Sequence, residues 1–179
     1  MSDIQVRPTI ASDLSRLMGF DHSIKSDSVW QLEFRRDTGQ VTTTFREVRL
    51  PRTIQVAYPH NPFSLADDWA RRSMMYTALI GGDPVGYIGM MERGISSTVW
   101  VTDLAVHPQY RRQGLGRGLL ASGQAWAESR AHHRLILEMP SKNLPTIRLA
   151  QKSGFEFCGY NDQYYLNKDV ALFFARVLK

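Results

Sequence analysis

The stretch Val101–Arg130, VTDLAVHPQYRRQGLGRGLLASGQAWAESR, decides how the rest of the chain is interpreted. It begins as an apolar, strand-like run, breaks at His107-Pro108, passes through a basic loop rich in glycine and ends in a long helical pattern. Gly114, Gly116 and Gly118 remove side chains where a ligand must come close, and free N–H groups at a helix start bind anions. The stretch therefore predicts a strand, a diphosphate-binding loop and a helix, although a tight turn with solvated arginines is the alternative.

Two common phosphate-binding motifs are excluded. The dinucleotide fingerprint requires glycine where the chain has Leu119, and the nucleoside triphosphate loop requires Gly-Lys-Ser/Thr, which the sequence lacks. The run Arg111-x-x-Gly114-x-Gly116, directly after Asp103-Leu104-Ala105-Val106-x-Pro108, instead resembles the acyl-CoA signature of the GNAT superfamily of N-acyltransferases. A second match follows at 143–155, where an asparagine precedes a helix that ends at Gly154-Phe155.

The resemblance implies an α/β GNAT-like fold, with a central mixed β-sheet flanked by helices, and acetyl-CoA as cosubstrate without a metal. It places the diphosphate on the glycine-rich loop and the pantetheine arm along the preceding strand, where a backbone N–H polarises the thioester carbonyl. It also turns the side chain of Asn143 towards the cofactor, although a plain helix cap explains this residue equally well. The implied cofactor-binding residues are Leu104, Ala105, Val106, Arg111, Arg112, Gln113, Gly114, Leu115, Gly116, Arg117, Gly118 and Asn143.

Acetyl transfer to an amine requires a base, because a primary amine with a pKa of about 10.4 is almost wholly protonated at pH 7. Asp103 is the carboxylate closest in sequence to the expected thioester, and it lies in an otherwise apolar strand that suits a general base. A hydrogen-bonded structural role fits Asp103 equally well. Glu92, Glu138 and His107 are the further candidates.

The acid that protonates the departing thiolate is a tyrosine in much of the superfamily, and the corresponding position here is Ala150. Tyr160, Tyr164 or Tyr165 could replace it from the last strands, or the thiolate could leave unaided. We expect a working N-acetyltransferase for a primary amine of a small molecule or peptide. The alternative is a catalytically impaired acyl-CoA sensor, which would bind the cofactor without releasing CoA in response to an acceptor.

The remaining segments predict strands on both sides of this unit. Residues 74–80 and 84–91 predict an antiparallel hairpin, and residues 134–139 predict a strand parallel to 98–106. Strand alternation would put Val99, Val101, Asp103 and Ala105 on one face. Extended segments between residues 28 and 58 predict an inserted hairpin, whose Trp30, Phe34 and Phe45 would line an acceptor pocket or pack in the core.

Composition limits the other possibilities. A chain of 179 residues predicts a single domain, residues 1–179. The single Cys158 excludes a disulfide framework, and the histidines lack metal-ligand spacing. The net charge of +5 is not gathered into one run and no apolar stretch could span a bilayer, so we expect a cytoplasmic protein without nucleic-acid or membrane partners. An exposed final strand would allow a homodimer. The tail from Gly159, together with the inserted hairpin, weakly resembles streptothricin-type acetyltransferases.

Overall fold

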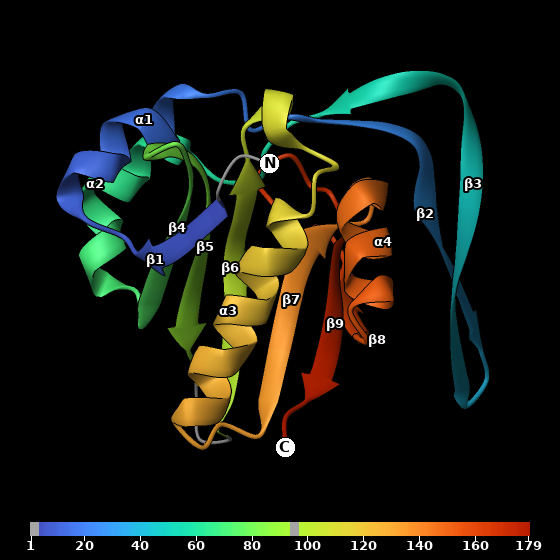
Figure 1. Ribbon diagram of the computed structural model, residues 1–179. Coiled ribbons are helices and arrows are strands. Elements are labelled where there is room, and N and C mark those ends of the chain that lie inside the picture. Colours follow the sequence, from blue (N-terminus) through green and yellow to red (C-terminus); the bar gives the residue numbers. More distant parts are fainter. Residues whose placement is uncertain (1–3, 94–96) are drawn as a thin grey trace.

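A mixed seven-stranded sheet forms the centre of the molecule, in a computed structural model that describes residues 4–93 and 97–179 (Figure 1). The strand order is β1-β4-β5-β6-β7-β9-β8, and β6 and β7 run parallel while their neighbours pair antiparallel. The bounds are β1 Ile4–Pro8, β4 Met74–Ile80, β5 Asp83–Glu92, β6 Thr98–Val106, β7 Arg134–Pro140, β8 Glu156–Asn161 and β9 Ala171–Val177. The predicted fold class, the β4–β5 hairpin and the parallel β6–β7 pair are confirmed.

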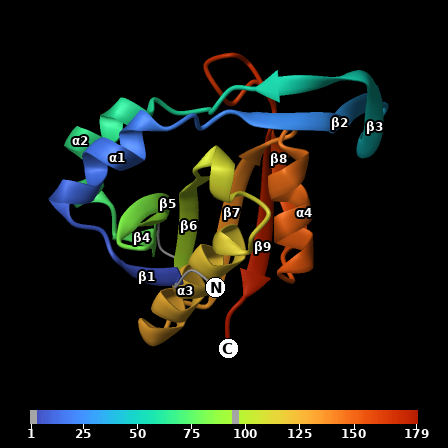
Figure 2. The same ribbon diagram turned by 45° about the horizontal axis from the view of Figure 1, so that its top comes forward.

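Helices cover both faces of this sheet. Adjacent β5 residues point to opposite faces, and Ile88 joins the apolar cluster of α3 and α4 while Tyr87 joins that of α1 and α2. Figure 2 shows α1 and α2 gathered beside β4 and β5, apart from α4. The helices are α1 Leu14–Gly19, α2 Leu65–Asp68, α3 Leu115–Ser129 and α4 Leu144–Lys152, with 3-10 turns η1 Ala11–Asp13, η2 Pro62–Ser64, η3 Trp69–Arg71 and η4 Pro108–Tyr110.

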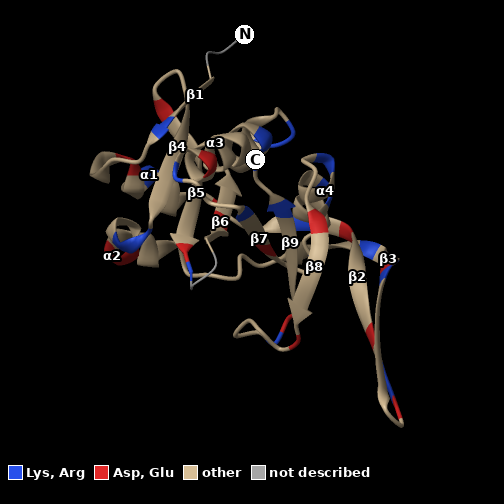
Figure 3. Ribbon diagram, turned by 90° about the horizontal axis from the view of Figure 1, so that it is seen from below, with Lys and Arg blue, Asp and Glu red and all other residues tan. Residues whose placement is uncertain are grey.

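The predicted hairpin insert is a separate two-stranded ribbon, β2 (Ile24–Asp37) and β3 (Gln40–Val56), which extends away from the body in Figure 3. Trp30 and Phe45, in the middle of the ribbon, pack against Phe157, with ring centroids 6.1 and 5.4 Å away. Phe34, nearer the tip, is 54% exposed. Trp30 and Phe45 therefore pack against the core, as one of the two interpretations predicted, whereas Phe34 does not.

A β-bulge in β6 corrects the expected distribution of its side chains. Met90 pairs with Val101 and Gly89 with Asp103, so Thr102 is an extra residue and the alternation changes phase there. Val101 consequently faces α3, whereas Ala105 packs with the α1 and α2 cluster. The prediction that Val99, Val101, Asp103 and Ala105 share one face was wrong, because the register with β5 is not visible in a single strand.

The C-terminal end also differs from expectation. The final strand β9 pairs with β7 on one side and β8 on the other, so the exposed sheet edge belongs to β8. The final strand is therefore unavailable for the edge pairing that suggested a homodimer. No helix in the part of the chain that the structure describes is long and apolar enough to cross a membrane. Within the same residues, no group of three or more His, Cys, Asp or Glu side chains could hold a metal ion.

Candidate active site

The parallel strands β6 and β7 separate at a fork. They pair only from Thr98 to Val101, against Arg134 to Leu137, and then part. Beyond the fork, on the α3 and α4 side, a cavity of about 630 Å³ lies against the end of β6 and the start of α4. Seven of the predicted cofactor-binding residues line it, namely Leu104, Val106, Arg111, Arg112, Gly114, Gly116 and Arg117.

The glycine-rich loop is shaped for an anion. Gly114 caps α3 with φ 90°, and Gly118 donates its N–H to the carbonyl of Gly114 at 2.9 Å. The N–H groups between these two residues precede the first helical hydrogen bond, so they are available to a ligand. Arg112 has φ 66°, which is unusual for a residue with a side chain and is typical of functional loops.

The other predicted cofactor residues lie outside the cavity lining. Leu115 is buried in the core at 2% exposure, and Ala105 faces the opposite side of the sheet because of the bulge. Gln113 donates to the carbonyl of Gln109 at 3.0 Å. Asn143 Oδ1 accepts the N–H of Thr146 at 3.1 Å, which is the helix-cap role. The side chains of Gln113 and Asn143 are thus partly engaged within the protein.

Arg111 is used in a way that the sequence did not suggest. Its Nε donates to the carbonyl of Val106 at 2.8 Å, while Nη1 and Nη2 donate to the carbonyls of Ser23 and Asp21 at 2.7 and 2.8 Å. Burial lowers the pKa of its guanidinium. Three of its N–H donors thus tie the end of β6 to the segment after α1, so Arg111 builds the cavity wall and leaves phosphate binding chiefly to other arginines.

Asp103 lies on the face opposite the cavity, inside a polar network. Tyr58 donates its hydroxyl to Oδ1 at 2.5 Å, Thr102 donates to Oδ2 at 2.8 Å, and Arg72 forms an ion pair with Oδ2. The carboxylate is only 4% exposed. Burial and the neighbouring Asp103 charge raise the pKa of Tyr58 well above its ordinary value, so this phenol stays protonated. Asp103 therefore has the hydrogen-bonded surroundings that its alternative, structural role predicts.

Glu138 lies on the other side of the fork, one residue past the last β6–β7 pair. Tyr164 donates to its Oε2 at 3.1 Å and Tyr165 to its Oε1 at 3.4 Å. Burial raises the pKa of its carboxyl, and the hydrogen bond from Tyr164 and the charge of His60 oppose that rise only in part. A carboxylate with a raised pKa beside an open fork is suited to take a proton from an amine.

The three candidate tyrosines separate into two groups. Tyr164 and Tyr165 meet at Glu138, whereas the hydroxyl of Tyr160 lies 2.9 Å from Oγ1 of Thr43 in the hairpin. Burial and the charge of Glu138 raise the pKa of Tyr165. Ala150 is fully buried in the core, so α4 offers no acid at the position of the family tyrosine. The structure therefore brings two of the three tyrosines to one carboxylate and leaves Tyr160 apart.

The remaining candidate bases have other contacts. Glu92 lies 3.0 Å from Nε2 of His132 at the far end of β5, and His107 Nδ1 accepts the N–H of Gln109 at 3.3 Å. Sequence reasoning missed Tyr58 and Arg72, which lie just after β3 and just after η3 and carry no local motif. His60 was also missed, although its ring contacts those of Tyr58 and Tyr165, at 5.7 and 6.2 Å, and so links the two sides of the fork.

Comparison with known proteins identifies the family. Residues 42–155 match the model of the acetyltransferase (GNAT) family. The streptothricin acetyltransferase of Streptomyces lavendulae is 25% identical over 169 residues, which cover 92% of this chain and 87% of that protein. An N-alpha-acetyltransferase of Sulfurisphaera tokodaii is 29% identical over 160 residues, covering 82% of this chain and 94% of the relative.

Solved structures show the same fold. The crystal structure of nourseothricin acetyltransferase superposes with a TM-score of 0.83 at 24% identity, over 98% of this chain and 99% of that one. A candidate streptothricin acetyltransferase from Bacillus anthracis, solved in complex with acetyl coenzyme A, gives a TM-score of 0.77 at 19% identity, over 99% of both chains. The likeness extends along the whole chain, including the N-terminal part that the sequence motifs matched only thinly.

Proposed function

The chain belongs to the acetyltransferase (GNAT) family and is an acetyl-CoA-dependent N-acetyltransferase, and on this premise we propose that it acetylates a primary amine of a streptothricin-like small molecule. The observation that carries the proposal is the fork, with the anion-binding cavity on one face and Glu138 on the other. A cosubstrate that passes through the fork would present its thioester to an amine held beside Glu138. The relative from Streptomyces lavendulae supports the acceptor class, because it aligns over nearly the whole chain.

Binding of acetyl-CoA would use the cavity described above. The free N–H groups of the loop, with Arg112 and Arg117, would hold the diphosphate by charge-assisted hydrogen bonds. The pantetheine arm would lie along the separated end of β6, where Leu104 and Val106 line the cavity. A backbone N–H of one of these two residues would stabilise the oxyanion that develops on the thioester carbonyl.

Transfer would begin with the acceptor ammonium beside Glu138. The Glu138 carboxylate takes one proton from the ammonium, the free amine nitrogen attacks the thioester carbon, and the C–S bond breaks to leave a thiolate, while the nitrogen releases its second proton to solvent to give the neutral amide. Since the amine attacks the activated ester directly, correct placement supplies much of the rate enhancement. The raised pKa of Glu138 improves its basicity while leaving it able to release the proton afterwards.

The thiolate needs a proton, and Ala150 cannot donate one. Tyr164 already donates its hydroxyl hydrogen to Glu138, and it is 37% exposed, whereas Tyr165 is 7% exposed. We assign Tyr164 as the relay: its phenol protonates the sulfur and regains a proton from Glu138. This route returns the proton taken from the amine to the leaving group and regenerates the ionised carboxylate.

The test combines binding and turnover. Acetyl-CoA is titrated calorimetrically into the wild type, the double variant Arg112→Glu, Gly116→Glu, and the control Arg36→Glu, whose exposed arginine lies on the hairpin. CoA release is then measured with streptothricin, a lysine-containing peptide and no acceptor. We expect micromolar binding that is lost only in the double variant, and turnover that requires streptothricin. Binding without acceptor-dependent release would support the sensor alternative, and equal binding by all three proteins would refute the cofactor site.

A further inference from the structure

Glu138 accounts for only one of the two protons that the reacting nitrogen loses when an ammonium becomes an amide. In the proposed function, the first proton passes through Glu138 and Tyr164 to the departing sulfur. Glu138 cannot take the second proton while it holds the first, since a carboxyl that already carries a proton no longer acts as a base. Each turnover therefore releases one net proton, which must leave the nitrogen by another route.

His60 lies between the two sides of the fork. Its ring packs edge to face against that of Tyr58, with centroids 5.7 Å apart, and against that of Tyr165, at 6.2 Å. On one side, Tyr58 donates its hydroxyl to Asp103 of β6 at 2.5 Å. On the other side, Tyr165 donates to Glu138 of β7 at 3.4 Å. Two rings thus hold the imidazole between the strands that part at the fork, on the side of the sheet where Glu138 lies.

The imidazole of His60 is free to exchange protons with water. The residue is exposed, and neither of its ring nitrogens forms a hydrogen bond or an ion pair within the part of the chain that the structure describes. Two other histidines near the site lack this freedom, because His22 is only 6% exposed and Nδ1 of His107 already accepts a backbone N–H. Histidine is the side chain that ordinarily gains and loses a proton between pH 5 and 8, so His60 is suited to carry a proton to solvent.

A proton on His60 also acts on Glu138. Burial is the main influence on the pKa of the Glu138 carboxyl and raises it, whereas a positive charge on His60 lowers that pKa. A proton that arrives at His60 therefore makes Glu138 a stronger acid when its own proton is needed at Tyr164, which already donates a hydrogen bond to Oε2 at 3.1 Å. The charge of Arg93 acts in the same direction, but it is permanent and does not change during the reaction.

We propose that His60 takes the second proton from the acceptor nitrogen and passes it to solvent. In this step the N–H bond of the acceptor breaks, its electron pair stays on the nitrogen as the neutral amide forms, and a new N–H bond forms on the imidazole. The first proton, taken by Glu138, is the one that reaches the thiol, and water afterwards removes the second from the imidazolium. The inference rests on the proposed function, because it completes the proton transfers of that reaction.

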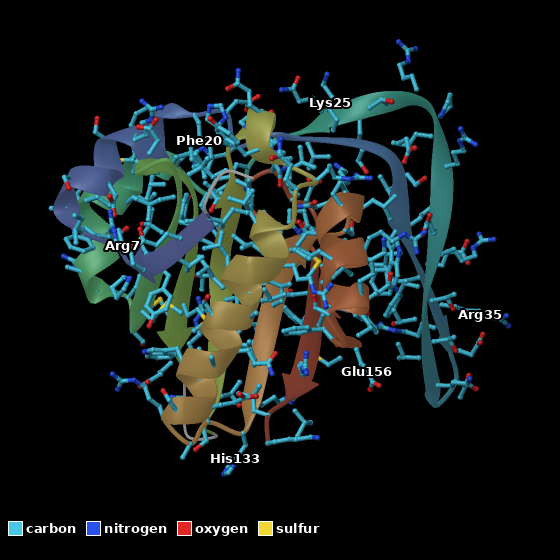
Figure 4. The ribbon with its side chains drawn as sticks, viewed as in Figure 1. Arg7, Phe20, Lys25, Arg35, His133 and Glu156 are labelled. Carbon is cyan, nitrogen blue, oxygen red and sulfur yellow. The ribbon has the colours of Figure 1, made fainter. Side chains whose placement is uncertain are left out.

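The test is chemical rescue of kcat. His60→Ala removes the imidazole and leaves room for a free one, whereas His60→Gln keeps a polar side chain that cannot take a proton. General acid–base groups contribute typically ~10²–10⁴-fold, and water can partly replace an exposed group, so both variants should lose about tenfold or more in kcat with streptothricin. Added imidazole should restore kcat several-fold in His60→Ala alone. The control His133→Ala removes an exposed histidine at the end of the molecule opposite Phe20 (Figure 4), and it should keep the kcat of the wild type.

Three results would overturn the inference. A kcat within about twofold of the wild type in both His60 variants would mean that water takes the second proton unaided. A raised KM for the acceptor with an unchanged kcat would make His60 a binding residue only. Equal stimulation of the wild type and His60→Ala by imidazole would be an effect of the buffer.

The wild type separates this inference from the proposed function. If it releases CoA in response to an acceptor and the His60 variants turn over normally, only the role of His60 is refuted. If it releases no CoA with any acceptor, the proposed function and the role of His60 are refuted together. The calorimetric Kd for acetyl-CoA should be unchanged in every variant, because His60 lies outside the lining of the cofactor cavity, and an unchanged Kd shows that the variant has folded.

Discussion

Two carboxylates flank the fork on the same face of the sheet, and their surroundings differ. Asp103 on β6 has the Arg72 guanidinium and the hydroxyls of Tyr58 and Thr102. Glu138 on β7 has two tyrosine hydroxyls and the more distant charges of His60 and Arg93, and no cation within the described residues forms an ion pair with it. The ion pair holds the Asp103 carboxylate in place, whereas Glu138, whose carboxyl pKa is raised by burial, is able to exchange a proton. On the proposed mechanism, the base is therefore selected by the partners of the carboxylate and not by its proximity in sequence to the expected thioester.

The largest effect should come from Glu138→Gln. A general base contributes typically ~10²–10⁴-fold, so kcat with the preferred acceptor should fall by about 10³-fold. The calorimetric Kd for acetyl-CoA should stay unchanged, because Glu138 lies outside the cofactor cavity. Glu92→Gln is the control, since Glu92 is an exposed carboxylate at the end of β5. Loss of less than about tenfold in kcat would remove Glu138 from the mechanism.

The second prediction concerns Asp103→Asn. Removing one partner of a buried ion pair leaves the other uncompensated, which typically costs about 3–5 kcal/mol. The free energy of unfolding, from urea denaturation, should fall by this amount, while kcat of the folded protein should fall by less than about tenfold. A variant with unchanged stability and a kcat as low as that of Glu138→Gln would reverse the comparison between the two carboxylates.

The third prediction follows from the raised pKa of Glu138. Because the folded state favours the protonated carboxyl, the stability that Glu138 contributes is complete below its ordinary pKa of 4.5 and is lost as the pH rises through the higher folded value. Glu138→Gln cannot lose this proton, so its Tm should exceed that of the wild type at pH 8. The two Tm values should converge below pH 4.5. A Tm difference that is independent of pH would contradict this interpretation.

The Glu138 carboxyl should also determine how kcat/KM falls at low pH. The kcat/KM of the wild type should rise with pH around a midpoint above 4.5, because only the ionised form of Glu138 accepts a proton from the acceptor. Asp103→Asn should keep that midpoint. A profile whose midpoint moves in Asp103→Asn would show that the two carboxylates titrate together.

The smallest effect separates the tyrosines. Tyr164→Phe should lower kcat by about tenfold if its phenol returns the proton to the sulfur, since it removes one member of a relay. Tyr160→Phe should leave kcat unchanged and should cost about 1 kcal/mol of stability, through the lost hydrogen bond to Thr43. Steady-state kinetics and urea denaturation of both variants check this contrast. Equal kcat values for the two would mean that the thiolate leaves without help from Tyr164.

The cofactor side of the site could be predicted because its signals are local. The strand, the loop with Gly114 and Gly116, and the start of α3 are consecutive in sequence, so one motif specifies their geometry. The role of Arg111 within that motif could not be predicted, since its partners Asp21 and Ser23 lie about ninety residues away in the chain. A motif identifies the backbone of a loop better than the contacts of its side chains.

The acceptor side depends on distant contacts and on register. Thr102 shifts the alternation of β6, and this bulge is defined by pairing with Gly89 and Met90 in another strand. Arg72, which decides the character of Asp103, is 31 residues away in sequence. Glu138 could have been ranked higher from the sequence alone, because it is a lone carboxylate in the apolar run Leu135-Ile136-Leu137-Glu138-Met139, as Asp103 is in its own strand. The difference between the two lies only in their partners.

The ribbon of β2 and β3 leaves and rejoins the body at neighbouring points, since Ile24 pairs with Val56. The entropy of closing such a loop grows only slowly with its length, so the tip can be shortened or extended without opening the sheet. A chain trimmed around the turn at residues 38–39 would lose the exposed Phe34 and Val41 but keep Lys25 at the base. The length of the ribbon is thus free to diverge, or to be engineered, independently of the catalytic fork.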